Sequence, residues 1–142
     1  MGKINVGRVI LGGIIAGIVI DLLDYLVDGM WLAPKWNAGN KALGVANFGS
    51  SQVVWFNVLG IITGIALIWL YAAIRPRFGA GVKTAIVAGI AVWFITALLP
   101  NAGFMWIGGL YSHQLTELTT FGGLVYTVIA AVAGATLYKE AA

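Results

Sequence analysis

The sequence predicts an all-α, polytopic membrane protein, a single domain built as a bundle of four transmembrane helices. Three observations support this fold class: 61% of the 142 residues are hydrophobic, only 9% are charged, and the apolar residues form four long runs. A soluble domain carries about 25% charged residues, and a helix needs about 20 mainly apolar residues to cross a bilayer. The chain has room for four such spans and for no separate soluble domain.

The four apolar runs cover approximately residues 8–30, 53–74, 82–99 and 121–138. The first run is too long for a signal-peptide core and lacks a convincing cleavage site, so we expect it to stay in the mature protein. Pro76, Gly79 and Gly81 predict a tight turn between the second and third helices. The connection after Pro100 is too apolar for a solvated loop. We expect it to form either an extension of helix 3 or a short interfacial helix between helices 3 and 4.

Basic residues predict the orientation of the bundle. Six fall on one side of the four-pass path and two on the other, namely Lys3, Arg8, Arg75, Arg77, Lys83 and Lys139 against Lys35 and Lys41. Because cytoplasmic loops carry an excess of Lys and Arg, we place both termini in the cytoplasm. Four tryptophans lie near the opposite helix ends, as in an aromatic belt, namely Trp31, Trp36, Trp55 and Trp106. The net charge of +3 therefore reflects topology, and we expect no nucleic-acid partner.

Small residues recur at helical spacing and predict the faces on which the helices pack. The glycines that mark these faces are Gly13, Gly17, Gly60, Gly64, Gly89 and Gly134. Within lipid, small residues let two helix backbones approach closely, as in the Gly-x-x-x-Gly motif. We therefore expect a compact bundle in the bilayer. We also expect its glycine faces to favour a homo-oligomer or association with other membrane subunits.

Three aspartates in the outer half of the first helix form the main candidate site. Asp21, Asp24 and Asp28 are spaced three and four residues apart, so they share one helix face. A carboxylate at the centre of a spanning helix costs roughly 2.5–3.5 kcal/mol. Three of them on one helix therefore need partners, water or a function.

Polar residues of the other helices match Asp21 in depth. Counted at about 1.5 Å per residue, Asn57, Thr96 and Thr127 reach the level of Asp21 if the helices are straight. We expect Asp21 to be protonated or hydrogen-bonded to Asn57 and Thr96. The sequence thus predicts a polar pocket that opens toward the outer face, above an inner half closed by glycine packing.

The aspartates allow three interpretations. In the first they are polar links between helices, with Asp28 at the water interface. In the second they pair with Lys35 or Lys41 of the following loop. In the third they bind a proton or a cation, since acidic residues inside membranes often mark ion pathways.

The sequence supports metal binding and catalysis less than it supports the three interpretations of the aspartates. His113 and Glu117 are four residues apart and share a helix face. With Asp24 or Asp28 they would offer a nitrogen and carboxylate set suited to Zn²⁺, Mn²⁺ or Fe²⁺, although both residues also suit a polar surface. The chain has no cysteine, no phosphate-binding glycine loop and no nucleophile elbow. We expect no cofactor and no enzymatic activity, and a membrane metalloenzyme ranks third among the hypotheses.

Two segments near the N-terminus resemble a known group of proteins. They are NVGRVILGG at residues 5–13 with Gly17, and Asp24-Tyr25 leading to LAPKW at residues 32–36. They resemble small, uncharacterised bacterial membrane proteins with four helices. The resemblance covers the first helix and its outer loop. It implies a four-span protein of the bacterial cytoplasmic (inner) membrane, and it brings no activity or catalytic residue.

These observations lead to two functional hypotheses. The first is a non-enzymatic accessory or structural subunit that works through helix contacts within a homo-oligomer or a larger membrane complex. The alternative is a carrier or channel-like module that binds a proton or cation in an outward-facing acidic pocket.

Overall fold

The computed structural model describes residues 3–141, and four helical stretches within them are long and apolar enough to cross a membrane. The first span is α1 (Val6–Asp24) continued by the π-helix η1 (Tyr25–Trp31). The second span is α3 (Ser50–Phe78), and the fourth is α6 (His113–Ala135). The third consists of α4 (Val82–Trp93), η2 (Phe94–Leu98), α5 (Leu99–Asn101) and η3 (Ala102–Ile107). The predicted all-α membrane bundle is confirmed.

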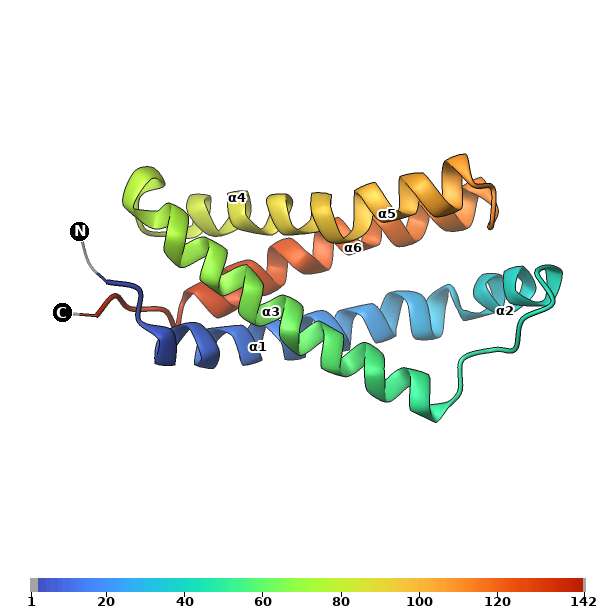
Figure 1. Cartoon of the computed structure of the whole chain (residues 1–142), viewed down its shortest axis with the longest axis horizontal. Coiled ribbons are helices and arrows are strands. Elements are labelled where there is room, and N and C mark those ends of the chain that lie inside the picture. The colour runs from blue at the N-terminus through green and yellow to red at the C-terminus, as the bar shows by residue number, and fades with distance from the viewer. Residues whose placement is uncertain (1–2, 142) are drawn as a thin grey trace.

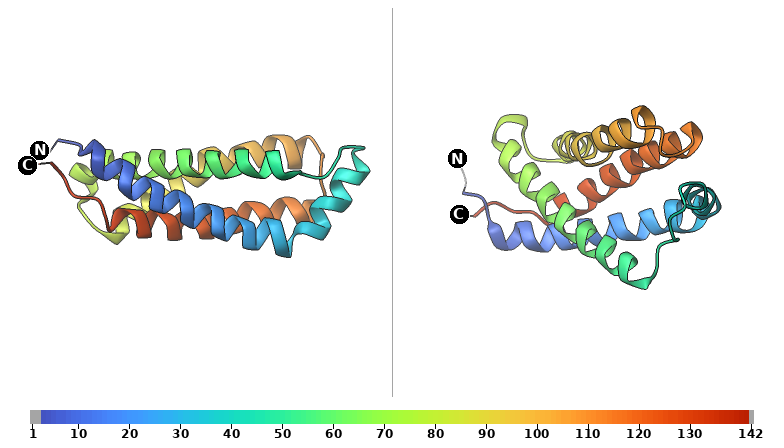
Figure 2. Two further views of the ribbon diagram at one scale, coloured as in Figure 1. Left: turned by 90° about the horizontal axis from the view of Figure 1, so that it is seen from below. Right: turned by 45° about the vertical axis from the view of Figure 1, so that its right-hand side comes forward.

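The four spans lie around a shared core in a fixed order of neighbours (Figure 1). The first span packs against α3 on one side and α6 on the other, and α4 packs against α6. Both termini lie at the same end of the bundle as the α3–α4 turn, which we call the terminal end. The short helix α2 (Ala33–Ala42) lies at the opposite end, the α2 end. Away from their turn, α3 and α4 diverge, so the bundle is splayed toward the α2 end (Figure 2).

Glycines set the distance between α1 and α3 where these helices cross. A Cβ at Gly13 would lie 2.5 Å from the Cα of Ile65, and a Cβ at Gly17 would lie 2.5 Å from the Cα of Ile61. A Cβ at Gly64 would lie 2.7 Å from the Cα of Gly17. Each of these contacts is with backbone, so no side-chain rotation would relieve it. The crossing therefore depends on the absence of side chains at these positions.

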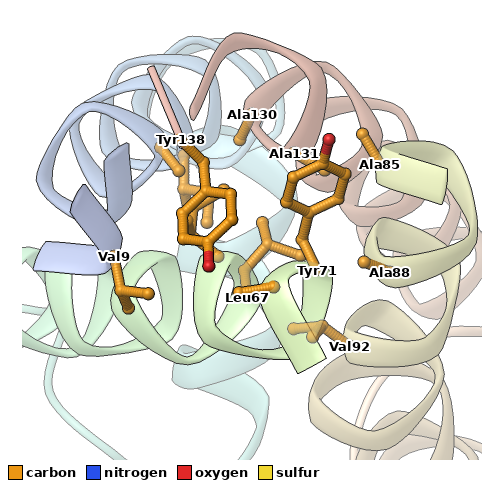
Figure 3. Packing of buried hydrophobic residues seen from close by; sticks show 13 residues of the cluster. Val9, Leu67, Tyr71, Ala85, Ala88, Val92, Ala130, Ala131 and Tyr138 are labelled. Carbon is orange, nitrogen blue, oxygen red and sulfur yellow. The ribbon is translucent and has the colours of Figure 1, made fainter. Parts of the chain in front are cut away.

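The main apolar core joins residues of all four spans (Figure 3). Leu67 and Ile68 of α3 are completely buried there. Tyr71 and Tyr138 meet edge to face with ring centroids 5.9 Å apart. Small residues of α4 and α6 complete the packing, and Figure 3 labels Ala85, Ala88, Ala130 and Ala131 among them. A separate, smaller cluster at the α2 end contains Leu32, Met105 and Leu115.

The connections differ in detail from the sequence prediction. The third helix continues past Pro100 to Ile107, and the fourth begins at His113, where the Ser112 side chain accepts a hydrogen bond from the amide of Leu115. This arrangement corresponds to the predicted extension of helix 3. Helix α2 was not predicted and occupies part of the connection between the first two spans. It has Pro34 in its first turn, where the missing N–H of proline breaks no helical hydrogen bond.

Candidate functional site

The candidate site begins where α1 changes into the π-helix η1. The change occurs between Asp24 and Tyr25, so Asp24 closes the α-helix and Asp28 lies inside η1. A π-helix is hydrogen-bonded from residue i to i+5 and is therefore wound less tightly than an α-helix. Asp28 consequently does not follow the straight stripe expected from a step of 3.6 residues per turn. Its side chain contacts α2 and α6 instead.

Asp28 accepts two hydrogen bonds at one carboxylate oxygen. The indole Nε1 of Trp36 donates to its Oδ1 over 2.9 Å, and the hydroxyl of Thr119 donates to the same oxygen. The other oxygen, Oδ2, is buried and has no hydrogen-bond partner within residues 3–141. Asp28 thus links the first span to α2 and α6 and leaves one acceptor unused.

Asp24 makes a similar link one turn deeper. The hydroxyl of Tyr126 in α6 donates to its Oδ1 over 2.9 Å. We call the five residues concerned the Asp24–Asp28 network, which consists of Asp24, Asp28, Trp36, Thr119 and Tyr126. Hydrogen bonds to ionised groups contribute about 1.5–3 kcal/mol each to stability. The network therefore holds three helices together at the α2 end, where the apolar core is small.

Asp21 stands apart from this network. It faces α3 at Gly60, where a Cβ would overlap the Asp21 carboxylate, so a larger residue there would require the Asp21 side chain to move. No side-chain hydrogen bond joins Asp21 to another residue in the described part of the chain, which runs from 3 to 141. The prediction that Asp21 bonds to Asn57 and Thr96 is therefore wrong for the described residues.

The other three polar candidates lie in separate places. Asn57 is exposed on α3, and its Nδ2 donates to the carbonyl of Val53 in the same helix over 2.7 Å. Thr96 is exposed, and its hydroxyl bonds to Val92, also within its own helix. Thr127 is buried in α6, next to the point where α6 passes Gly89. The structure therefore brings Asp24 and Asp28 together but not Asp21, Asn57, Thr96 and Thr127.

The remaining glycine candidates lie at two other helix contacts. A Cβ at Gly89 of α4 would lie 3.0 Å from the Cα of Val128 in α6. A Cβ at Gly134 of α6 would lie 2.6 Å from the carbonyl oxygen of Gly12 in α1. Together with the α1–α3 crossing, these contacts place glycine at the interfaces of all four spans.

His113 and Glu117 are both exposed at the start of α6. The His113 ring lies 6.4 Å from that of Trp106, measured between centroids. Across residues 3–141, no three His, Cys, Asp or Glu side chains are placed to hold a metal ion. Lys35 donates to Gln114 over 2.7 Å, and within the same described range neither Lys35 nor Lys41 forms an ion pair with an aspartate.

Sequence reasoning missed the partners of the two networked aspartates. Trp36 was assigned to the aromatic belt, and neither Thr119 nor Tyr126 was singled out. A signal was present, because Thr119 and Tyr126 are seven residues apart and so lie on one face of α6. Matching that face against Asp28 and Asp24 in an antiparallel helix would have identified both pairs.

The network is suited to holding helices in place. Its donors are an indole, a hydroxyl and a phenol, and its acceptors are the two carboxylates. Comparison with known proteins adds no relative, since no family model, no curated protein and no solved structure matches the chain.

Proposed function

We propose that the protein is a non-enzymatic accessory or structural subunit that binds other transmembrane helices, in a homo-oligomer or a larger membrane complex. The observation that carries this proposal is the state of the first ten residues of α3, Ser50–Leu59. Every one of them is exposed, although ten residues make nearly three helical turns and thus present all faces. Trp55 and Leu59, for example, are 67% and 54% exposed. No residue of this segment is buried, and the ring of Phe48 in the preceding connection meets that of Phe56 edge to face, with centroids 5.3 Å apart.

Asn57 lies in the middle of that segment. Its amide is satisfied only by its own helix, through the bond from Nδ2 to Val53. In lipid, an amide side chain finds its best hydrogen-bond partners on another helix, and such bonds contribute about 0.6–2 kcal/mol to association. Bulky apolar residues around one amide are therefore the features of a helix that binds a second helix.

The experiment measures the size of the assembly in mild detergent by native mass spectrometry. We expect wild-type protein to run above its monomer mass of 15.0 kDa, and Asn57→Leu to shift the population toward the monomer. Trp69→Leu is the matched control, because Trp69 is also exposed on α3 but lies in the part that packs against α1. A wild-type protein that is purely monomeric under these conditions would contradict the proposal.

The absence of cysteine from the chain allows a second measurement that identifies the partner. A disulfide forms only when two Cα atoms come within about 7 Å. Asn57→Cys should cross-link in native membranes if the partner is a second copy, whereas Trp69→Cys should not. Assembly above the monomer mass without this cross-link would assign the contact to a different subunit.

We infer further that both termini face the cytoplasm of a bacterial cell and that the protein resides in its cytoplasmic membrane. The terminal end carries six of the eight basic residues, in the manner of the positive-inside rule. A membrane-impermeant maleimide should label Lys41→Cys in intact spheroplasts and should label Lys83→Cys only after lysis. The reverse pattern would invert the orientation.

Binding of a proton or cation is the second candidate function. It is favoured by Asp28 Oδ2, a buried carboxylate oxygen that has no donor within the part of the chain described. Proteoliposomes should then show proton or cation flux that Asp28→Asn abolishes and Glu140→Gln, outside the spans, leaves unchanged. If wild-type proteoliposomes conduct no more than protein-free liposomes, this candidate fails.

A further inference from the structure

An apolar groove of about 530 Å³ runs along the outside of the bundle between the first span and α6. Its lining residues are Leu23, Val27, Trp31, Glu117, Leu118, Phe121, Gly122, Val125, Tyr126 and Ile129. Glu117 and Tyr126 are the polar members of this set, and the hydroxyl of Tyr126 is already bonded to Asp24. None of the three aspartates of the first span lines the groove, so Tyr126 is the one residue that the groove shares with the Asp24–Asp28 network.

The groove has the length of one membrane leaflet. On α6 it extends from Glu117 to Ile129, which is roughly 18 Å of helix at 1.5 Å per residue. The hydrocarbon core of a bilayer is about 30 Å thick, so one leaflet contributes roughly 15 Å. Trp31 and Glu117 mark the end nearest α2, and Ile129 marks the end farther from α2. The dimensions therefore suit a single lipid chain that enters from the leaflet on the α2 side.

Gly122 forms the base of the groove and leaves it open for a ligand. Gly122 has no side chain, and a Cβ there would lie 3.0 Å from Cγ1 of Val27. The walls are formed by side chains that reach outward, with Phe121 54% exposed and Val125 60% exposed. The groove is thus part of the lipid-facing surface rather than of the internal core.

Opposite charges lie near the mouth of the groove. Glu117 is exposed and forms no ion pair within residues 3–141. Lys35 reaches the preceding turn of α6, where its Nζ donates to Gln114 over 2.7 Å. Gln114 and Glu117 are three residues apart and therefore neighbours on the helix surface. An ammonium and a carboxylate so placed complement the phosphate and ammonium of a zwitterionic headgroup.

We propose that this groove binds one acyl chain of an aminophospholipid of the phosphatidylethanolamine type. The chain lies along Gly122 and Val125, the headgroup ammonium pairs with Glu117, and the phosphate lies near Lys35. This binding is independent of any helix that pairs with α3, because the groove is formed by the first span and α6.

The test measures which lipid the purified protein retains. Protein in mild detergent is equilibrated with equal amounts of phosphatidylethanolamine and phosphatidylglycerol that carry identical acyl chains, and bound lipid is counted by native mass spectrometry. We expect wild type to favour phosphatidylethanolamine about two- to fivefold, the range that an exposed ion pair supports. Glu117→Gln should reduce this preference to near unity.

Filling the groove tests the acyl chain. Val125→Trp should abolish retention of both lipids, whereas Ile62→Trp, at a 56% exposed position of α3, should retain them as wild type does. Glu117 is a surface residue, so its variant keeps the proposal testable even if Val125→Trp fails to fold.

Three results would overturn the proposal. The first is equal retention of the two lipids by wild type, and the second is an unchanged preference in Glu117→Gln. The third is a lipid-free dimer that Val125→Trp converts to monomer, because the groove would then belong to a second copy of the chain.

Discussion

The substitution Gly13→Ala tests the α1–α3 crossing most directly. A Cβ at this position would lie 2.5 Å from the Cα and 2.9 Å from the amide nitrogen of Ile65. Ordinary contacts of a Cβ begin at 3.4 Å. The two backbones would therefore have to separate by about 0.9 Å, because a backbone atom cannot rotate out of the way as a side chain can.

The free energy of unfolding should fall by about 3 kcal/mol in this variant. Inserting one methyl group into a tightly packed interior typically costs 1–3 kcal/mol, and the upper end applies where two backbones meet. A gap of 0.5–1 Å also forfeits about a quarter to a half of the dispersion energy of each contact that it opens. The neighbouring contacts of the completely buried Leu67 and Ile68 would be loosened in this way.

The assay is reversible unfolding in mixed micelles of increasing SDS mole fraction, followed by circular dichroism. Gly7→Ala is the matched control, because Gly7 lies on the same helix and its nearest neighbour atom would be 3.6 Å away. Alanine is the better helix former by up to about 1 kcal/mol, so this control should be neutral or slightly stabilising. Equal unfolding midpoints for Gly13→Ala and Gly7→Ala would refute the close crossing.

Three further variants test other parts of the structure in the same unfolding assay. Tyr126→Phe removes the donor to Asp24 and should cost about 1–2 kcal/mol; no change would show that this hydrogen bond does not help to hold α6 against the first span. The free energy of unfolding of Thr96→Val should stay within about 0.5 kcal/mol of the wild-type value because Thr96 is exposed. A large loss would instead indicate that the Thr96 side chain is buried among polar partners. Glu140→Gln breaks the partly exposed pair with Arg75, 3.6 Å apart, and should cost less than about 1 kcal/mol; a larger loss would mean that the pair anchors the C-terminal segment.

Much of the fold could be predicted because the apolar composition of a segment largely determines whether it crosses the membrane. The four apolar runs determine the number of spans, and the small residues within them indicate where the helices approach one another. The ends of the helices were predicted less accurately. The second span begins at Ser50 and ends at Phe78, beyond the predicted 53–74, because a helix continues into polar residues until its last backbone groups are satisfied. Pro76 lies inside its last turn and does not end it.

The candidate site could be predicted only in part, because its geometry depends on departures from regular helices. The expected alignment of Asp21 with Thr96 assumes straight α-helices. The third span instead contains π-helix from Phe94, shortly before Pro100. Proline lacks the N–H that an α-helix requires and clashes with the carbonyl four residues earlier, and a π-segment is one way to accommodate it. Thr96 lies within this segment, so its direction cannot be obtained from a step of 100° per residue.

The two halves of the bundle differ in what holds them together, and this difference bears on function. The terminal half is held together by backbone contact at glycines and by the main apolar core. At the α2 end, α3 diverges from α4, and the Asp24–Asp28 network replaces much of the missing apolar packing. That network ties α2 and α6 to the first span and does not include α3, so none of its hydrogen bonds reaches the segment Ser50–Leu59. The exposure of Ser50–Leu59, beyond the reach of this network, is therefore the feature on which the proposed binding of other helices depends.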